Sequence, residues 1–314
     1  MARLTVDLQR EQVRAIVRDL DSTREPVGFA RLHGGTSDVY RIDVAGAENP
    51  LVLKIYPDEP AWTMAKEALV AGWIGGRAGL PIPQWLRVDE RRTRIPYRFA
   101  LTTWLPGVTV RSLIGAPGIE DAYRQMGALL RRLHAIPMPA YGYIVADGIR
   151  RPRPTNDDYM RIAFGQAFRQ FREQGADENL TRRLEDKAQS RFHLLQHSAG
   201  PVFCHDDLQP GNVLAEHAED GSPQLTGLID FGNARAGDAL FDLAKALFCC
   251  THEDPRSRAP LLAGYGAIDH PDPEQALWLY TLFHRLVMWT SFTRRGDTLD
   301  GPAGLLRDLD AMSR

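Results

Sequence analysis

The chain has 314 residues, of which 44% are hydrophobic and 25% charged, so it can bury a full core and is long enough for two domains. A formal net charge of −2 gives no electrostatic basis for binding nucleic acid or an anionic membrane. The charged N-terminus lacks the apolar segment of a secretion signal, and no apolar run is long enough to cross a bilayer, so we expect a cytoplasmic protein. The sequence does not indicate an oligomeric state.

The first hundred residues have the pattern of a small sheet. Apolar residues at helical spacing predict an amphipathic helix over residues 12–20. Segments 28–44 and 51–56 are rich in alternating or β-branched residues and predict antiparallel strands. Between the first two strands, Gly35, Thr36 and Ser37 form a turn that could cradle phosphates, because glycine lets the backbone approach a ligand and the next residues donate hydrogen bonds. The same composition is ordinary hairpin chemistry.

Lysine is scarce in this chain, and one of the four lysines lies inside an apolar strand. Lys54 stands in LVLKIY, where an ammonium group must reach a cleft or extend to water. The following helical segment carries Glu67 between apolar neighbours. An acid there can pair with Lys54 and hold it against nucleotide phosphates, which is the arrangement of a kinase. A snorkelling lysine and a solvated glutamate are the alternative interpretation.

A change of pattern marks the expected domain boundary. The strand YRFALTTWL ends at Pro106 and Gly107, and from Tyr123 onward apolar residues recur with the period of a helix. We therefore predict an N-terminal nucleotide-binding lobe over 1–101, a hinge over 102–107 and a mainly helical C-terminal lobe over 108–314. Backbone groups of the hinge, at Thr103 and Leu105, are expected to read an adenine edge.

Two motifs in the C-terminal half carry the chemistry. HDDLQPGN places Asp207 five positions before Asn212, which is the spacing between the catalytic Asp and the metal-binding Asn of a kinase catalytic loop. Asp230 then opens a D-F-G sequence at the end of an apolar strand. One carboxylate can deprotonate an acceptor hydroxyl while the other oxygens hold magnesium. The turn-rich segment between the motifs predicts a hairpin.

The acceptor is expected to be a small molecule. Only seven residues separate Gly232 from Leu240, which leaves no room for the long segment that docks a polypeptide in protein kinases. Acids that could contact a cationic substrate include Asp158, Glu253 and Asp254, although such residues more often cap helices or face solvent. We interpret Asp242 as part of the scaffold. The three cysteines are expected to be buried thiols, because their spacing fits neither a disulfide framework nor a zinc site.

The chain resembles the aminoglycoside phosphotransferase and choline kinase-like family, small-molecule kinases of the protein-kinase-like fold. The resemblance covers nearly the whole length and rests on the following segments: LHGGTSDVYRI, the VLK strand, the LLRRLHAI helix, HDDLQPGN, and IDFG followed by GDALFDLA. It implies an α+β bilobal fold with a small antiparallel β-sheet and one helix in the N-terminal lobe.

The resemblance also implies roles for individual residues. Lys54 and Glu67 would be the phosphate-positioning ion pair, Asp207 the catalytic Asp, and Asn212 with Asp230 the Mg²⁺ ligands. Two departures are that Asp206 stands where the family usually has Gly, and Gln209 where it often has His. Asp206 adds a negative charge that could contact substrate or alter metal affinity.

The activity implied is transfer of the ATP γ-phosphoryl group to a hydroxyl of an aminoglycoside-like antibiotic, an amino alcohol or a sugar. A catalytically silent ATP-binding scaffold or sensor of the same fold is the alternative. The complete set of five polar residues favours the enzyme.

Overall fold

The computed structural model describes residues 6–32, 38–56, 61–77, 81–219, 221–296 and 301–314. The chain divides into two compact units. The first unit consists of residues 1–122, 145–148 and 210–232, and the second of residues 123–144, 149–209 and 233–314. The predicted hinge, 102–107, lies within the first unit, and so does the segment that ends with the D-F-G sequence.

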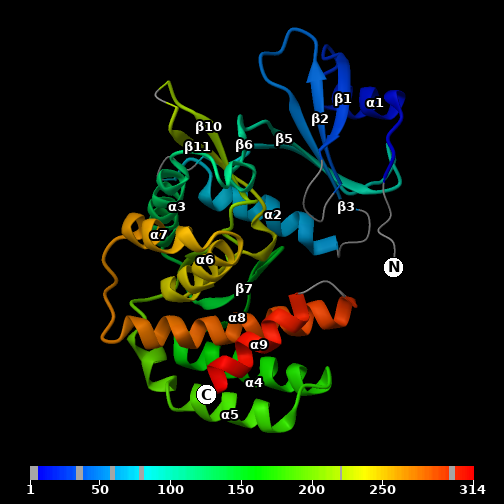
Figure 1. Ribbon diagram of the computed structural model, residues 1–314. Helices are drawn as coiled ribbons and strands as arrows, with labels where there is room; N and C mark the ends of the chain where they lie inside the picture. The colour runs from blue at the N-terminus through cyan, green and yellow to red at the C-terminus, as the bar shows by residue number, and fades with distance from the viewer. Residues whose placement is uncertain (1–5, 33–37, 57–60, 78–80, 220, 297–300) are drawn as a thin grey trace. The chain divides into compact units, whose positions relative to one another are not determined.

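A five-stranded antiparallel sheet forms the larger part of the first unit (Figure 1), and its strand order is β1-β2-β3-β5-β4. Its strands are β1 (Pro26–Leu32), β2 (Asp38–Val44), β3 (Leu51–Tyr56), β4 (Trp85–Asp89) and β5 (Arg98–Thr103). Helix α1 (Arg10–Leu20) packs its apolar face, including Val13, Ile16 and Val17, into the core of this sheet. The amphipathic helix and the antiparallel strands predicted from the sequence are confirmed.

Helix α2 (Ala61–Ile74) follows β3 and is apolar on most of its surface. Met64 packs in a cluster with Tyr56 of β3 and Ala100 of β5. Lys66 and Glu67 are buried as well, which requires that both find partners inside the protein.

A second, smaller sheet completes the first unit, in the order β11-β10-β6. Its elements are β6 (Val108–Thr109), the 3-10 helix η2 (Val110–Leu113), β10 (Val213–His217) and β11 (Pro223–Leu228). The predicted hairpin between the two motifs is therefore present as β10 and β11. Gly107 has φ +98°, and a Cβ there would overlap the carbonyl group of Ala215, so only glycine fits where the chain enters this sheet.

The second unit contains a four-stranded sheet and most of the helices. The sheet has the order β8-β7-β12-β9, formed by β7 (Tyr141–Val145), β8 (Gly148–Arg153), β9 (Val202–Cys204) and β12 (Arg235–Gly237). The helices are α3 (Ile119–His134), α4 (Asn156–Glu173), α5 (Glu178–Gln189), α6 (Ala239–Glu253), α7 (Arg258–Tyr265), α8 (Pro273–Arg295) and α9 (Gly301–Ser313), and the 3-10 helices are η3 (Phe192–His197), η4 (Phe231–Asn233, at the boundary) and η5 (Pro255–Ser257).

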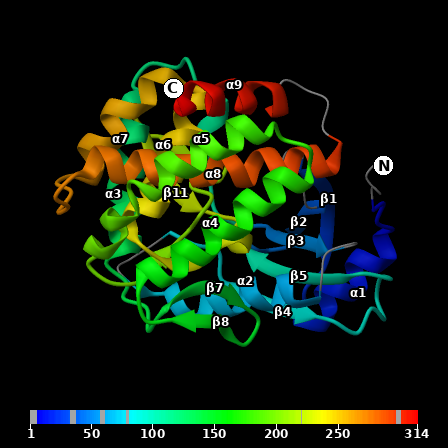
Figure 2. The same ribbon diagram turned by 90° about the horizontal axis from the view of Figure 1, so that it is seen from below.

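Helix α8 is the centre of the helical layer. It contacts α4, α6 and α9, and α5 contacts α4 and α9, as Figure 2 shows for this part of the chain. Aromatic rings fill the space between them: Phe283 of α8 lies 5.2 Å from Phe164 of α4 and 5.7 Å from Phe241 of α6, measured between ring centroids. None of the described helices combines the length and the apolarity that spanning a membrane requires.

Helices α3 and α7 pack so closely that two glycines touch the opposite backbone. A Cβ at Gly127 of α3 would overlap the carbonyl group of Leu261, and one at Gly264 of α7 would overlap that of Arg124. The absence of side chains at these two positions sets the distance between the helices.

We predict that Gly127→Ala destabilises the protein by about 3 kcal/mol, because a rigid backbone on the facing helix cannot yield to the added methyl group. Urea unfolding followed by circular dichroism measures this. Gly165→Ala is the matched control, since Gly165 lies within α4 with open space around its Cα, and there alanine should stabilise by about 0.5–1 kcal/mol. Equal effects of the two substitutions would contradict the packing argument.

Candidate active site

Three predicted site residues lie together in the first unit. Strand β3 runs between β2 and β5, with Lys54 paired to Val39 on one side and Ala100 on the other. The Lys54 ammonium group donates to both carboxylate oxygens of Glu67, at 3.0 and 2.8 Å, and lies 3.5 Å from the Asp230 carboxylate. Lys54 is therefore paired inside the protein, and the snorkelling interpretation is wrong.

The electrostatics of this group follow from burial. The Lys54 side chain is 16% exposed and that of Glu67 only 6% exposed. Burial by itself lowers the pKa of Lys54, but the Glu67 carboxylate, with further contributions from Tyr56 and Asp230, raises it well above the usual value. Lys54 therefore stays a cation. The side chain of Asp230, in contrast, is 43% exposed and remains accessible to a ligand.

Helix α2 also fixes the D-F-G segment. Lys66, which is fully buried beside Glu67, donates from its ammonium group to the carbonyl of Gly232 at 2.7 Å. Sequence reasoning assigned no role to Lys66. The signal was present, because a lysine in a predominantly apolar helix of a chain with four lysines requires a partner.

The two predicted metal ligands are connected through the backbone. The amide of Ile229, directly before Asp230, donates to the carbonyl of Asn212 at 3.0 Å. Asn212 is 9% exposed. An amide oxygen and a carboxylate oxygen are donors that suit Mg²⁺, which binds through oxygen ligands and keeps several waters, and the exposed Asp230 leaves room for them. This donor set fits the metal.

The remaining predicted nucleotide contacts have different outcomes. Gly35, Thr36 and Ser37 lie outside the described residues. Thr103 ends β5, and its amide already donates to the carbonyl of Gln84 at 2.9 Å, so that N–H is used within the sheet. The Leu105 side chain packs over Gly227 of β11, where a Cβ would lie 2.7 Å from a Leu105 methyl group.

In the second unit, a buried carboxylate holds the backbone directly before Asp207. Asp242 of α6 accepts hydrogen bonds from the backbone amides of His205 and Asp206, at 2.7 and 2.8 Å. The Asp242 carboxylate also contacts His134 of α3, whose Nε2 lies 3.2 Å away. Burial raises the pKa of Asp242, but the bonds from His134 and the loop amides outweigh it, and the net shift is downward. Asp242 is part of the scaffold, as interpreted from the sequence.

Asp206 does not face a substrate. It is 4% exposed and forms an ion pair with Arg235 of β12, whose side chain is 16% exposed. Because β12 pairs with β9 and places Arg235 opposite Cys204, the guanidinium group comes directly beside the loop. Arg235 also donates to the hydroxyl of Tyr159 at 3.2 Å and lies over the ring of Phe241. The negative charge expected from the sequence is thus neutralised internally.

The environment of Asp206 shifts its titration. Burial raises the pKa of the Asp206 carboxyl, while Arg235 and then Lys245 oppose this shift. Lys245 of α6 is partly buried. Burial lowers its pKa, but the nearby Asp206 and Asp207 carboxylates raise it. His284 lies 4.0 Å from Asp206, but burial holds the pKa of His284 well below its usual value, so it adds no cation.

The backbone is strained at both motifs. Among the described residues, four that are not glycine have a positive φ, and two of these are Asp206 at +56° and Asp230 at +67°. Such conformations cost energy and are found preferentially at functional sites. Asp207, half-buried, directly follows the first of them.

The acids considered for substrate binding differ in whether their carboxylates already have partners inside the protein. Asp158 exchanges hydrogen bonds with Thr155 at the start of α4. Asp254 is buried and binds the guanidinium group of Arg256 at 2.9 Å and the hydroxyl of Tyr123 at 3.0 Å. Glu253 is half-buried at the last position of α6. Asp158 and Asp254 are therefore engaged at helix ends, as the capping interpretation predicts.

One buried group in the described part of the chain has the donor types of a metal site: His134, Cys204 and Asp242. His134 uses Nε2 toward Asp242 and Nδ1 toward the hydroxyl of Tyr265, at 2.9 Å. Burial raises the pKa of Cys204 well above its usual value, so the thiolate that would bind a metal is disfavoured. This group is structural.

Comparisons with known proteins find a matching family model and solved structures of the same fold. A model of the phosphotransferase enzyme family matches residues 28–279. Among solved structures, aminoglycoside phosphotransferase APH(4)-Ia has a TM-score of 0.72 at 19% identity, covering 98% of this chain and 99% of that one. Its ternary complex with ADP and hygromycin B, in a thermostable mutant, also gives 0.72 at 19% identity, covering 96% and 98%. A GDP and kanamycin complex of APH(2″)-IIIa gives 0.65 at 18% identity, covering 95% and 97%. These likenesses confirm the protein-kinase-like fold.

Removing the Asp206 carboxylate should destabilise the protein although glycine suits its backbone. Asp206→Gly relaxes the positive φ but leaves Arg235 as a buried cation without its carboxylate, and we predict a loss of about 3 kcal/mol in the free energy of unfolding. Adding Arg235→Met should recover most of this loss, because the methionine can pack against Phe241. Chemical unfolding of the single and double variants tests the pair. Wild-type stability of Asp206→Gly alone would show that the ion pair contributes nothing.

Proposed function

Because the chain belongs to the phosphotransferase enzyme family, we propose that it transfers the γ-phosphoryl group of ATP to a hydroxyl of a small molecule in a Mg²⁺-dependent reaction. The observation that carries the proposal is the buried pair of Lys54 and Glu67, with the accessible Asp230 carboxylate 3.5 Å from the ammonium group. A buried cation whose position is fixed and which lies beside an accessible acid is suited to hold phosphates and a metal ion.

Each residue of the first unit has one task in this proposal. Lys54 binds the α- and β-phosphates, and Glu67 keeps it charged and aligned. Lys66 holds the backbone at Gly232 and thereby the orientation of Asp230. Asn212 and Asp230 would hold Mg²⁺, which would neutralise phosphate charge when bound.

Asp207 receives the proton. As the acceptor oxygen forms its bond to the γ-phosphorus, its hydrogen passes to the Asp207 carboxylate, and the bond from phosphorus to the bridging oxygen of ADP breaks. The transferred group passes through a loose transition state, so positioning and electrostatic stabilisation supply most of the acceleration. Asp242 contributes by holding the amides of His205 and Asp206, which directly precede Asp207.

The acceptor is a small molecule in this proposal. Strand β12 and helix α6 follow the D-F-G sequence at once, so the chain has no long segment there that could dock a polypeptide. The complexes of similar fold contain hygromycin B or kanamycin with a nucleotide, which makes polyhydroxylated molecules the first acceptors to try, followed by amino alcohols and sugars.

Asp207→Asn should lower turnover by about 10²- to 10⁴-fold while Mg²⁺-ATP binds with nearly unchanged affinity, because the substitution removes only the proton acceptor. ADP release during a screen of hydroxyl compounds, together with calorimetric titration of a non-hydrolysable ATP analogue, measures both quantities. Retention of most of the activity would show that Asp207 is not the base. An absence of turnover by wild type on a broad panel, with normal nucleotide binding, would favour a silent ATP-binding scaffold.

Substitutions at the ion pair should affect nucleotide use in a graded way. Lys54→Met removes the phosphate contact and should lower kcat/KM for ATP by about 10²-fold or more. Glu67→Gln keeps the size but weakens the alignment of Lys54 and should cost about 10-fold. Lys187→Met on α5 is a matched control that should behave as wild type in steady-state assays. If Lys54→Met left kcat/KM unchanged, the pair would be only structural.

A further inference from the structure

The face of helix α6 that holds the backbone before Asp207 also carries a lysine. Asp242 binds two amides of this backbone near the start of the helix. About two turns later, the Sγ of Cys250 lies 4.0 Å from the carbonyl oxygen of Leu208. Helix α6 therefore runs along the loop on both sides of Asp207. Lys245 lies between these two contacts, about 60° around the helix from Asp242.

Lys245 is a cation with no direct partner. Burial lowers its pKa, but the carboxylates of Asp206 and Asp207 outweigh burial, and the net shift is upward. The thiol of Cys249 offers no counter-charge, because burial raises its pKa to about 12. The ammonium group of Lys245 keeps accessible surface, and within the described part of the chain it has neither a hydrogen bond nor an ion pair. It is therefore available to a ligand.

The proposed reaction leaves this cation unbalanced. The charged side chains that act most strongly on Lys245 are Asp206, Asp207 and Arg235. Asp206 is paired with Arg235, so these two charges cancel. Asp207 becomes neutral when it takes the proton of the acceptor hydroxyl. A negative group on a bound molecule can then supply the counter-charge that Lys245 needs.

The acids that could attract a cationic acceptor are already engaged. All four that the sequence offers for this purpose have partners within the protein: Asp158, Asp206, Glu253 and Asp254. An ammonium group on the acceptor would have to compete for these carboxylates, and it would be repelled by Lys245. An anionic group meets neither obstacle.

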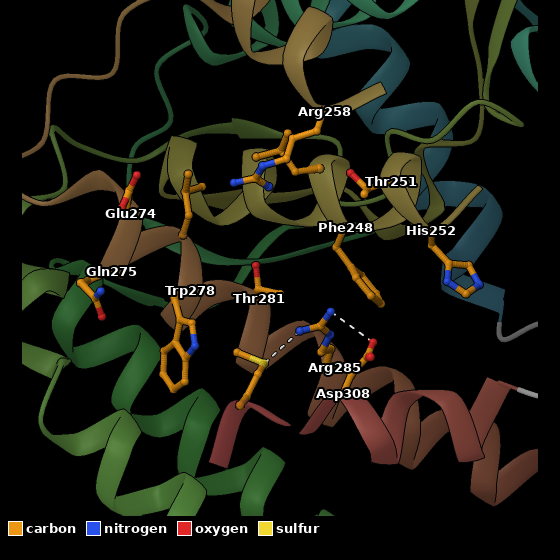
Figure 3. Close-up of a pocket in the computed structure, with 13 residues that line it drawn as sticks. Phe248, Thr251, His252, Arg258, Glu274, Gln275, Trp278, Thr281, Arg285 and Asp308 are labelled. Carbon is orange, nitrogen blue, oxygen red and sulfur yellow. Dashed lines mark hydrogen bonds and ion pairs between the residues drawn. The ribbon is translucent and has the colours of Figure 1, made fainter. Parts of the chain in front are cut away.

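The same face of α6 continues into a cavity of about 630 Å³, which lies where α6, α7, α8 and α9 meet. Phe248 and His252, about one and two turns after Lys245, line this cavity, as Figure 3 shows. Its size suits a small organic molecule. The arginines and the acids of its lining are equal in number, so their charges balance: Arg258, Arg285, Glu274 and Asp308. Selection by charge therefore falls to Lys245.

We propose that the phosphate acceptor carries a carboxylate or phosphate group of its own, which Lys245 binds while the accepting hydroxyl lies at Asp207. An ammonium group donates charge-assisted hydrogen bonds to either kind of oxygen. The proposal rests on the proposed function, because it takes Asp207 as the proton acceptor. It narrows that function to anionic hydroxyl compounds and separates this chain from the proteins of similar fold whose complexes contain hygromycin B or kanamycin.

Four compounds built on one sugar ring test the preference. Glucosamine is a cation, glucose is neutral, and glucuronate and glucose 6-phosphate carry a carboxylate and a phosphate. Each is titrated calorimetrically into the full-length wild type in the presence of Mg²⁺ and a non-hydrolysable ATP analogue. We expect at least one anion to bind about 10-fold or more tightly than glucose, and glucosamine to bind more weakly than glucose. Failure of both anions to reach this margin, or tightest binding of glucosamine, would overturn the proposal.

Variants assign the preference to Lys245. Lys245→Met should lower the ratio of anion affinity to glucose affinity by about 10-fold or more, because it removes the charge, whereas Lys245→Arg should keep most of the preference. Lys187→Met, at a partly buried position of α5, is the matched control and should keep the wild-type ratio. Circular dichroism checks that each variant is folded. An unchanged ratio in Lys245→Met would place the anion elsewhere and contradict the assignment.

ADP release with the same four compounds separates this proposal from the proposed function. Anion binding that Lys245→Met abolishes, without ADP release from any compound, would support the anion site and refute phosphoryl transfer. ADP release with the same kcat/KM for all four compounds would support transfer and contradict the anion preference. Equal losses of kcat/KM for all four in Lys245→Met would place Lys245 at the transferred phosphoryl group and also contradict the proposal.

Discussion

The interaction on which the first unit depends is the buried pair of Lys54 and Glu67. An ammonium group on a central strand is tolerable only if a carboxylate satisfies it, and here the carboxylate comes from the helix that follows the strand. Because α2 also carries Lys66, which donates to the carbonyl of Gly232, one helix fixes both the Lys54 ammonium group and the D-F-G segment. Loss of the pair would therefore disturb the strand, the helix and Asp230 together.

In the second unit, buried charged side chains likewise hold the backbone directly before Asp207. Asp242 accepts hydrogen bonds from the amides of His205 and Asp206, and Arg235 pairs with the Asp206 carboxylate, so both residues before Asp207 are fixed. Asp206 takes a conformation that glycine would adopt at lower cost, and its carboxylate forms a buried ion pair with Arg235. The charge that distinguishes this loop from the usual family pattern is thus a structural charge.

Local patterns predicted much of this structure. Residue type and spacing predict the strands, the amphipathic first helix, the hairpin and the Lys54–Glu67 pair. The family match confirms the resemblance seen in the sequence. The pairing of Asp206 with Arg235 could not be predicted, because it depends on β12 returning beside β9, a long-range register that no local pattern reveals. The sequence assigns Asp242 to the scaffold but does not reveal its partners, because Asp238 caps the helix and Asp242 binds amides of a distant loop.

The most direct test of the account is a comparison of ATP with adenosine, each titrated into the wild-type protein in the presence of Mg²⁺ and again with the metal chelated. If Lys54, Asn212 and Asp230 bind the phosphates and the metal, ATP should bind at least 100-fold more tightly than adenosine, and most of that advantage should disappear without Mg²⁺. Equal affinities for ATP and adenosine under both conditions would contradict the account, because the phosphates would then make no favourable contact with these residues.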